Sequence, residues 1–473
     1  MRLFHCASFL TALFLSAANA QIPDTPAGRQ FTAWRAAQDS EDPAKIKRFL
    51  DASLPFGQVD QELAMHKQTG GFEIKEVERS SDLQIVVLVQ TRNPPRQFAR
   101  VTMGVEAAEP HQIARLSIQN IPPPPDPAEF PVAPLSDAGL ASALGAWIGK
   151  EAAADVFAGA ALVAHNGKVI FSGAYGLASR ERRTPNTLDT QFRIGSMNKM
   201  FTATGVLQLV QAGKVRLNDP LSKYITDYPN PEVAAKVTIH QLLTHTGGTG
   251  DFFGPEFDAH RLELRSLNDY VILFGRRGLE FEPGSRWAYS NYGMLLAGVV
   301  IERVSGQSYY DYVAEHIYKP AGMTLTGSQP ENETVAGRAA GYMHSQSGAK
   351  WTPNTDTLPY RGTSAGGGYS TVGDLLKFAQ ALMAHKLLDA EHTALLITGK
   401  VEAGDGAMYA YGFEDAREKD GAGWVGHSGG APGMNGDLRM FPKAGYVVAV
   451  LSNLDPPAAS EISHFVSVRL PKH

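Results

Sequence analysis

The sequence has almost no cysteine, because Cys6 is the only one among 473 residues. A lone thiol cannot form an intrachain disulfide, and a chain without further thiols cannot build a zinc site from cysteine ligands. The 14 histidines show neither His-Glu-x-x-His nor His-x-x-Glu-His, the spacings that are typical of zinc hydrolases. We therefore expect no metal and no cofactor.

An excess of charge of one sign is also lacking. The chain has 43 Lys and Arg against 48 Asp and Glu, and its formal net charge is −5 at pH 7. Proteins that bind nucleic acid or anionic membranes usually carry a basic excess. We expect neither of these partners and expect a small molecule instead. The composition indicates no particular oligomeric state.

The apolar run at the N-terminus, Phe9–Leu15, is much shorter than the roughly 20 residues of a membrane-spanning helix. Arg2 precedes this run and Ala18-Asn19-Ala20 follows it, as in a cleaved secretory signal. We predict a signal peptide at residues 1–20 and a mature protein that is periplasmic or secreted. Cleavage after Ala20 would remove Cys6 as well as any membrane contact.

Residues 21–120 have the pattern of a small α+β leader domain. Helical periodicity over Gln30–Gln68 is followed by four segments of strand character. The arrangement resembles leader domains of cystatin-like or NTF2-like shape. The prolines from Pro122 to Pro134 then predict an extended, semi-rigid linker over residues 121–135.

Residues 136–473 form the second predicted domain. Asn166-Gly167 is a strong signal for a tight turn between two strands, Gly159–His165 and Lys168–Ser172. Further strands are expected near the C-terminus, and a helix is expected at each end of the domain. These elements are a helix near Leu140–Ile148, strands at Gly436–Phe441 and Tyr446–Ser452, and a helix over Ala458–Val468.

Gly195-Ser196-Met197-Asn198-Lys199 opens a helical run, Met200–Val210. This places Ser196 at a helix N-terminus and Lys199 one turn later on the same face. A neutral lysine there can accept the proton of the serine hydroxyl, and the helix N-terminus favours an oxyanion. Ser347-Gly348-Ala349-Lys350 has the same spacing but lies in a polar stretch without a following helix. We therefore predict Ser196 as the nucleophile and Lys199 as its activating partner.

Tyr289-Ser290-Asn291 lies on a loop that leads into the apolar run Met294–Ile301. We expect the Tyr289 hydroxyl to relay protons and the Asn291 amide to hold a substrate carbonyl. Tyr228-Pro229-Asn230 has the same spacing, but its proline indicates a surface turn.

His427-Ser428-Gly429-Gly430 precedes two strands and suits an edge strand that lines a cleft. The glycines permit close approach of the backbone, so the N–H groups of Gly430 and Ser196 can form an oxyanion hole. His245-Thr246-Gly247 is a competing match, but it ends a helical run, where Gly247 suits a C-cap. We interpret His245 as structural.

The ordered set Ser196-x-x-Lys199, Tyr289-x-Asn291 and His427-Ser428-Gly429 resembles the serine β-lactamases, the penicillin-binding proteins and their esterase relatives. Thr190–Gly195, Leu242–Gly247 and Gly366–Thr371 are similar to the class C and CubicO-type branch. The resemblance implies an antiparallel sheet with flanking terminal helices and an inserted helical subdomain. It also implies a covalent acyl-enzyme.

His427 departs from the family pattern, because β-lactamases and transpeptidases usually have a lysine at this place. A histidine is mostly neutral at pH 7, so it favours a neutral acyl substrate over one with a carboxylate. We rank hydrolysis of carboxylic esters first, a D-amino-acid peptidase or amidase second, and a β-lactamase third.

Two other classes remain as alternatives. An α/β-hydrolase needs Gly-x-Ser-x-Gly between a strand and a helix, and neither Gly362–Gly366 nor Gly426–Gly430 has that context. A non-catalytic binder of cell-wall peptides would have no need of Ser196 and Lys199 together. Both alternatives are therefore ranked below a serine hydrolase of the β-lactamase type.

Overall fold

The computed structural model describes residues 21–94, 96–344, 351–403, 407–416 and 423–471. The predicted signal peptide lies outside these ranges. The chain divides into two compact units, Met1–Pro123 and Pro124–His473, and the division falls inside the proline-rich segment. No helix within the described ranges is long and apolar enough to cross a membrane.

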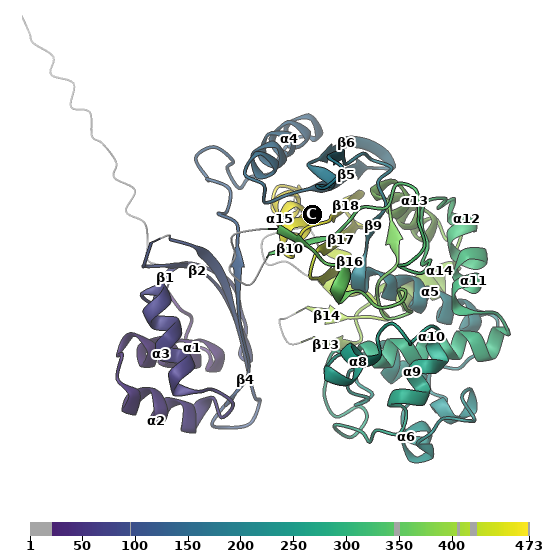
Figure 1. Cartoon of the computed structure of the whole chain (residues 1–473), viewed down its shortest axis with the longest axis horizontal. Helices are drawn as coiled ribbons and strands as arrows, with labels where there is room; N and C mark the ends of the chain where they lie inside the picture. Colours follow the sequence, from purple (N-terminus) through teal and green to yellow (C-terminus); the bar gives the residue numbers. More distant parts are fainter. Residues whose placement is uncertain (1–20, 95, 345–350, 404–406, 417–422, 472–473) are drawn as a thin grey trace, which may run out of the picture. The chain divides into compact units, whose positions relative to one another are not determined.

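The first unit packs three helices against an antiparallel sheet with the strand order β1-β2-β3-β4 (Figure 1). Thr25 and Asp42 cap the first two helices, each of which begins with a proline. Trp34 stacks on Phe72 with the ring centroids 6.0 Å apart, which joins the helical layer to the sheet. The elements are α1 (Pro26–Asp39), α2 (Pro43–Ser53), α3 (Val59–Thr69), β1 (Phe72–Ser80), β2 (Gln84–Thr91), β3 (Phe98–Val105) and β4 (Ile113–Ile121).

The second unit is built on an eight-stranded sheet in which every neighbouring pair is antiparallel. Strands from both ends of the unit meet in this sheet, since β18 pairs with β5. The fold class expected from the sequence is thus confirmed. In spatial order the strands are β13 (Val401–Glu402), β14 (Met408–Tyr409), β15 (Glu414–Ala416), β16 (Trp424–Ala431), β17 (Met434–Phe441), β18 (Tyr446–Ser452), β5 (Gly159–His165) and β6 (Lys168–Tyr175).

Helices cover both faces of this sheet (Figure 1). The terminal helices α4 (Asp137–Ala153) and α15 (Ala458–Ser467) lie on one face, and α13 (Val372–Met383) lies on the other. Side chains of β5 alternate between the two layers, with Leu162 in one core and Val163 in the other. Every residue of β5 except the last is buried, because each face of the strand has its own hydrophobic core.

A helical subdomain is inserted between β9 and β12, which pair with each other. Its elements are η1 (Gly195–Met197), α5 (Asn198–Gln211), η2 (Leu221–Lys223), α6 (Pro231–Lys236), α7 (Ile239–Leu243), α8 (Pro255–His260), α9 (Leu267–Phe274), α10 (Asn291–Ser305), α11 (Tyr309–Val313), η3 (Ala314–Tyr318) and α12 (Lys319–Ala321). The remaining elements of the unit are β7 (Leu177–Ser179), β8 (Thr184–Pro185), β9 (Phe192–Arg193), β10 (Tyr342–His344), β11 (Trp351–Pro353), η4 (Thr355–Thr357), β12 (Tyr369–Ser370) and α14 (Ala390–Ile397).

Two local expectations need correction. β16 is not an edge strand over its whole length, because Trp424–Gly426 pairs with β15; the pairing ends there, and the stretch from His427 onward lies beyond it. Tyr228 is buried and its hydroxyl lies 3.2 Å from that of Tyr292, so its turn is anchored in the core. The hairpin at Asn166-Gly167 forms as predicted, with positive φ at both residues.

The second half of the predicted linker is docked on the second unit. The ring of Phe130 lies 5.7 Å from that of Trp147 and 5.8 Å from that of Phe465, and it is buried. Arg469 donates a hydrogen bond of 2.6 Å to the Phe130 carbonyl. One apolar side chain therefore fixes an otherwise proline-rich segment, an effect that composition alone does not reveal.

We predict that Phe130→Ala lowers the free energy of unfolding by about 3 to 5 kcal/mol, because it leaves a cavity between two aromatic rings. Urea unfolding of the full chain, followed by tryptophan fluorescence, measures the change. Val132→Ala is the matched control, since Val132 is 65% exposed and its truncation should alter stability by less than about 0.5 kcal/mol. Equal effects of the two substitutions would contradict the docking of the linker.

Candidate active site

Ser196 and Lys199 lie at the start of the central buried helix of the second unit. Ser196 belongs to the short turn η1, and Lys199 is in the first turn of α5. The Lys199 Nζ donates to Ser196 Oγ at 3.1 Å, as the spacing predicts. Ser196 is half-buried, whereas Lys199 has no exposed surface. The hydroxyl is thus accessible while the amine behind it is shielded from water.

Three oxygens surround the Lys199 amine. Besides Ser196 Oγ, it donates to Asn291 Oδ1 at 2.7 Å and to the Ala365 carbonyl at 2.5 Å. Burial disfavours the ammonium form and lowers the pKa of Lys199 to about 7, although the negative charge of Asp251 acts in the opposite direction. A large fraction of the amine is therefore neutral at pH 7 and able to accept the serine proton.

Tyr289 lies two residues before the start of α10, beside the same amine. The Lys199 Nζ is 4.6 Å from the centroid of the tyrosine ring, and the phenol hydroxyl is hydrogen-bonded to Ser196. Burial raises the pKa of Tyr289 well above its usual value. The hydroxyl is therefore protonated at pH 7 and can donate a proton, whereas Lys199 is the group with a pKa suited to a base.

Asp251 is a member of the site that the sequence did not reveal. Its Oδ2 accepts from Asn291 Nδ2 at 2.7 Å and from the Asn291 backbone N–H at 3.3 Å. The amide nitrogen that we expected to hold a substrate carbonyl is thus bonded to a carboxylate, and the amide oxygen faces Lys199. No motif contains Asp251, because it lies 40 residues before its partner in the chain.

The glycine-rich end of β16 lies against η1, as an oxyanion hole requires. A Cβ on Gly429 would lie 2.0 Å from the Ile194 carbonyl oxygen and 3.0 Å from the Ser196 nitrogen. A Cβ on Gly195, whose φ is +53°, would lie 3.0 Å from the Gly430 nitrogen. Only glycines permit this close approach of the two backbone segments, and an oxyanion hole built from the Ser196 and Gly430 N–H groups depends on it.

His427 is buried in the sheet and held by two oxygens. Its Nδ1 lies 2.5 Å from the Ser428 carbonyl, which can only accept, so this nitrogen carries the proton. The Nε2 then accepts from the Tyr409 hydroxyl at 3.0 Å. Burial lowers the pKa of His427 to about 3, so the ring is neutral at pH 7. The Ser428 hydroxyl donates a hydrogen bond of 3.4 Å to the Glu414 carboxylate.

His245 is buried beneath the tyrosine of the site. Its ring centroid lies 4.4 Å from that of Tyr289 and 4.6 Å from that of Tyr409. The Ser290 backbone N–H donates to its Nδ1 at 3.2 Å, which ties the loop before α10 to this ring. Burial lowers the pKa of His245, so it too is neutral. We interpreted His245 as structural, and the structure places it directly against the predicted proton relay.

The competing serines do not offer a second nucleophile. Ser364 is fully buried and donates to the Leu295 carbonyl at 3.2 Å, so it is unsuited to attack a substrate. Ser347-Gly348-Ala349-Lys350 lies outside the described residues. No cluster of metal-ligating side chains is found in the described ranges.

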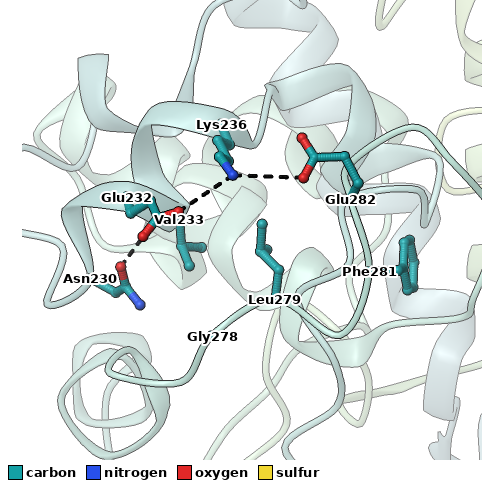
Figure 2. Close-up of a pocket in the computed structure, with 8 residues that line it drawn as sticks. All are labelled: Asn230, Glu232, Val233, Lys236, Gly278, Leu279, Phe281 and Glu282. Atoms are coloured by element: carbon teal, nitrogen blue, oxygen red, sulfur yellow. Dashed lines mark hydrogen bonds and ion pairs between the residues drawn. The ribbon is translucent and has the colours of Figure 1, made fainter.

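Asn230 lines a separate pocket of about 330 Å³ near α6 (Figure 2). The charges of this pocket are paired with each other, because Lys236 lies 3.4 Å from Glu232 and 3.6 Å from Glu282. None of the residues that line it is a serine, a cysteine or a predicted site residue. We therefore do not assign the reaction to this pocket.

Comparisons with known proteins show the family of the second unit. The profile of the family described as Beta-lactamase matches residues 146–470. The chain is 32% identical to a putative penicillin-binding protein, PbpX, of Bacillus subtilis (strain 168), over 62% of this chain and 70% of that protein. It is 34% identical to the esterase EstB of Burkholderia gladioli, over 37% of this chain and 48% of that protein.

Solved structures are similar as well. The penicillin-binding protein from Bacillus halodurans matches with a TM-score of 0.62 and 34% identity, over 68% of this chain and 98% of that one. The D-amino acid amidase from Ochrobactrum anthropi SV3 matches with a TM-score of 0.57 and 26% identity, over 69% of this chain and 97% of that one. Both likenesses leave about a third of the chain unmatched.

We predict that the rate at which a fluorophosphonate labels Ser196 rises with pH through a midpoint near pH 7. Below the pKa of about 7 Lys199 is protonated and cannot accept the serine proton, and above it the neutral amine can. Labelling rates from about pH 5 to about pH 9, with mass mapping of the modified peptide, measure the midpoint. A rate independent of pH, or a label on another serine, would contradict the assignment.

Proposed function

Because the chain belongs to the β-lactamase family of serine hydrolases, we propose that it is an exported enzyme that hydrolyses carboxylic esters through an acyl-enzyme on Ser196. Export is supported by the signal-like sequence of residues 1–20, where basic, apolar and small residues follow in order. The leader unit carries no catalytic set that we recognise in its described residues. The reaction is therefore assigned to the second unit alone.

The observation that carries the choice of esters is the neutral, buried His427. The family resemblance places a lysine at this strand position in enzymes whose substrates carry a carboxylate. Here burial holds the pKa of the ring near 3, so this position offers no positive charge at pH 7. A neutral acyl group does not need such a charge, whereas a carboxylate-bearing substrate gains from one.

The mechanism follows from the placement of the groups. Ser196 Oγ attacks the acyl carbon while its proton passes to the neutral Lys199 amine, and the carbonyl oxygen becomes an oxyanion near the Ser196 and Gly430 N–H groups. When the C–O bond to the alcohol breaks, the Tyr289 hydroxyl donates a proton to the leaving oxygen and recovers one from Lys199. Water then attacks the acyl-enzyme by the same route, releasing the acid and free Ser196.

A second candidate function is hydrolysis of amides of D-amino acids. It is favoured by the structural similarity to the amidase from Ochrobactrum anthropi SV3, which covers 97% of that chain. An amine leaving group needs protonation more than an alkoxide does, and the raised pKa of Tyr289 keeps its proton in place for this step. Turnover of D-phenylalanine amide beside a short-chain aryl ester separates the two activities.

We predict that Ser196→Ala abolishes turnover of a short-chain aryl ester, because the acyl-enzyme cannot form, and leaves the unfolding temperature within about 2 °C of the wild type. Initial rates and thermal unfolding check both parts. Ser364→Ala is a matched control at the buried serine of the competing motif, and it should keep the activity. Retained turnover in Ser196→Ala would exclude Ser196 as the nucleophile.

We predict that His427→Lys shifts specificity toward acyl substrates that carry a carboxylate. A positive charge at this place should raise their kcat/KM relative to neutral esters by about tenfold. His427→Gln is the matched control, since it is neutral and can still accept from Tyr409, and it should keep the wild-type preference. An unchanged preference in His427→Lys would remove the specificity argument.

A further inference from the structure

Asp251 contacts the site through one partner, Asn291, and that contact determines which atom Lys199 meets. Asp251 Oδ2 accepts from Asn291 Nδ2 at 2.7 Å, and Asn291 Oδ1 accepts from Lys199 Nζ at 2.7 Å. We propose that Asp251 is a positioning residue that fixes the Asn291 amide and keeps Lys199 in place for proton transfer. The inference rests on the proposed role of Ser196 as the nucleophile.

The orientation of an amide is otherwise ambiguous, because its oxygen and nitrogen ends have nearly the same shape. A carboxylate can only accept, so it selects the orientation in which Nδ2 faces Asp251 and Oδ1 faces Lys199. The opposite orientation would place two donors against each other at Lys199 and two acceptors against each other at Asp251. Without the carboxylate, nothing in this pair of contacts excludes that arrangement.

Asp251 is itself held firmly by its own segment of chain. Its Oδ1 accepts from the backbone N–H groups of Phe252 at 2.7 Å and Phe253 at 3.2 Å. Arg277 donates to its backbone carbonyl at 2.8 Å, and the other guanidinium nitrogen is paired with Glu256. The Asn291 backbone N–H at the start of α10 also donates to the carboxylate, where a helix favours negative charge.

The charge of Asp251 has a second effect on the amine. His245, His427 and Tyr289 face Lys199 from three other segments, and all three are neutral at pH 7. Glu414 lies farther along the sheet, 3.9 Å from His427 Nδ1. Asp251 is therefore the charge that opposes the effect of burial and favours the protonated form of Lys199.

The effect of Asp251 on geometry and the effect of its charge on Lys199 change the pH dependence of the rate in different ways. Replacing the carboxylate by an amide should slow the reaction at every pH, because Asn291 and Lys199 lose their fixed geometry. The same change should move the acid limb of the pH profile to lower pH, because loss of the negative charge at Asp251 lowers the pKa of Lys199. A residue with a merely structural role would lower the rate without moving the limb.

The test compares Asp251→Asn with the wild type by fluorophosphonate labelling of Ser196 as a function of pH. We expect the plateau rate to fall by about 10- to 100-fold and the midpoint to move down by about one pH unit or more. An unchanged plateau or an unchanged midpoint overturns the proposal. Asp251→Ser removes the charge with a smaller side chain, and it must move the midpoint in the same direction.

Two further variants complete the design. Asp258→Asn makes the same chemical change at an exposed position in α8, and it should match the wild type in both measurements. In an Asn291→Ala background the loss of plateau rate caused by Asp251→Asn should largely disappear, because the two residues act in series. Additive losses overturn the positioning role. If the wild type is not labelled at Ser196, the proposed function itself is refuted. If the wild type and Asp251→Asn are both labelled and behave alike, only the positioning role of Asp251 is refuted.

Discussion

The exclusion of water from the Lys199 amine is the constraint on which the site depends. An ammonium group without water is costly, so burial favours the neutral amine that the chemistry requires. Three oxygens at 2.5 to 3.1 Å keep the amine hydrogen-bonded. They come from η1, from the start of α10 and from the loop before β12, so three segments that are far apart in the sequence must fold together before Lys199 becomes a base.

The same constraint explains why the histidines around the site are neutral. A second cation in the same dry space would repel a protonated lysine and would itself be costly to bury. His427 satisfies both ring nitrogens with neutral oxygens, from Ser428 and Tyr409, and His245 accepts a backbone N–H. A histidine at position 427 is therefore compatible with the dry interior as an uncharged group. Of the carboxylates near the site, Asp251 lies behind Asn291, and Glu414 lies beside Ser428.

Local signals in the sequence predicted what depends on local geometry. Asn166-Gly167 predicts a hairpin because few residues adopt positive φ, and Ser196 and Lys199 meet because a helix repeats every 3.6 residues. Asp251 and Tyr409 were missed because each meets its partner only through the tertiary fold, and Phe130 was missed because prolines dominate its segment. Tyr228 was read as a surface turn, since proline signals a turn but does not reveal what the turn packs against.

The burial of the serine side chain distinguishes the Ser196 motif from the competing Ser364 motif. The spacing of residues in the sequence does not make this distinction. Ser364 lies in a Gly-x-Ser-x-Gly match, yet its hydroxyl donates to a helix carbonyl in the core and no substrate can reach it. Ser196 lies between buried neighbours but is itself partly exposed, beside a backbone that only glycines allow to come so close. A nucleophile must face the substrate while its base is shielded from water. A turn at the N-terminus of a buried helix meets both requirements, because the residue before the helix is open and the first turn behind it is covered.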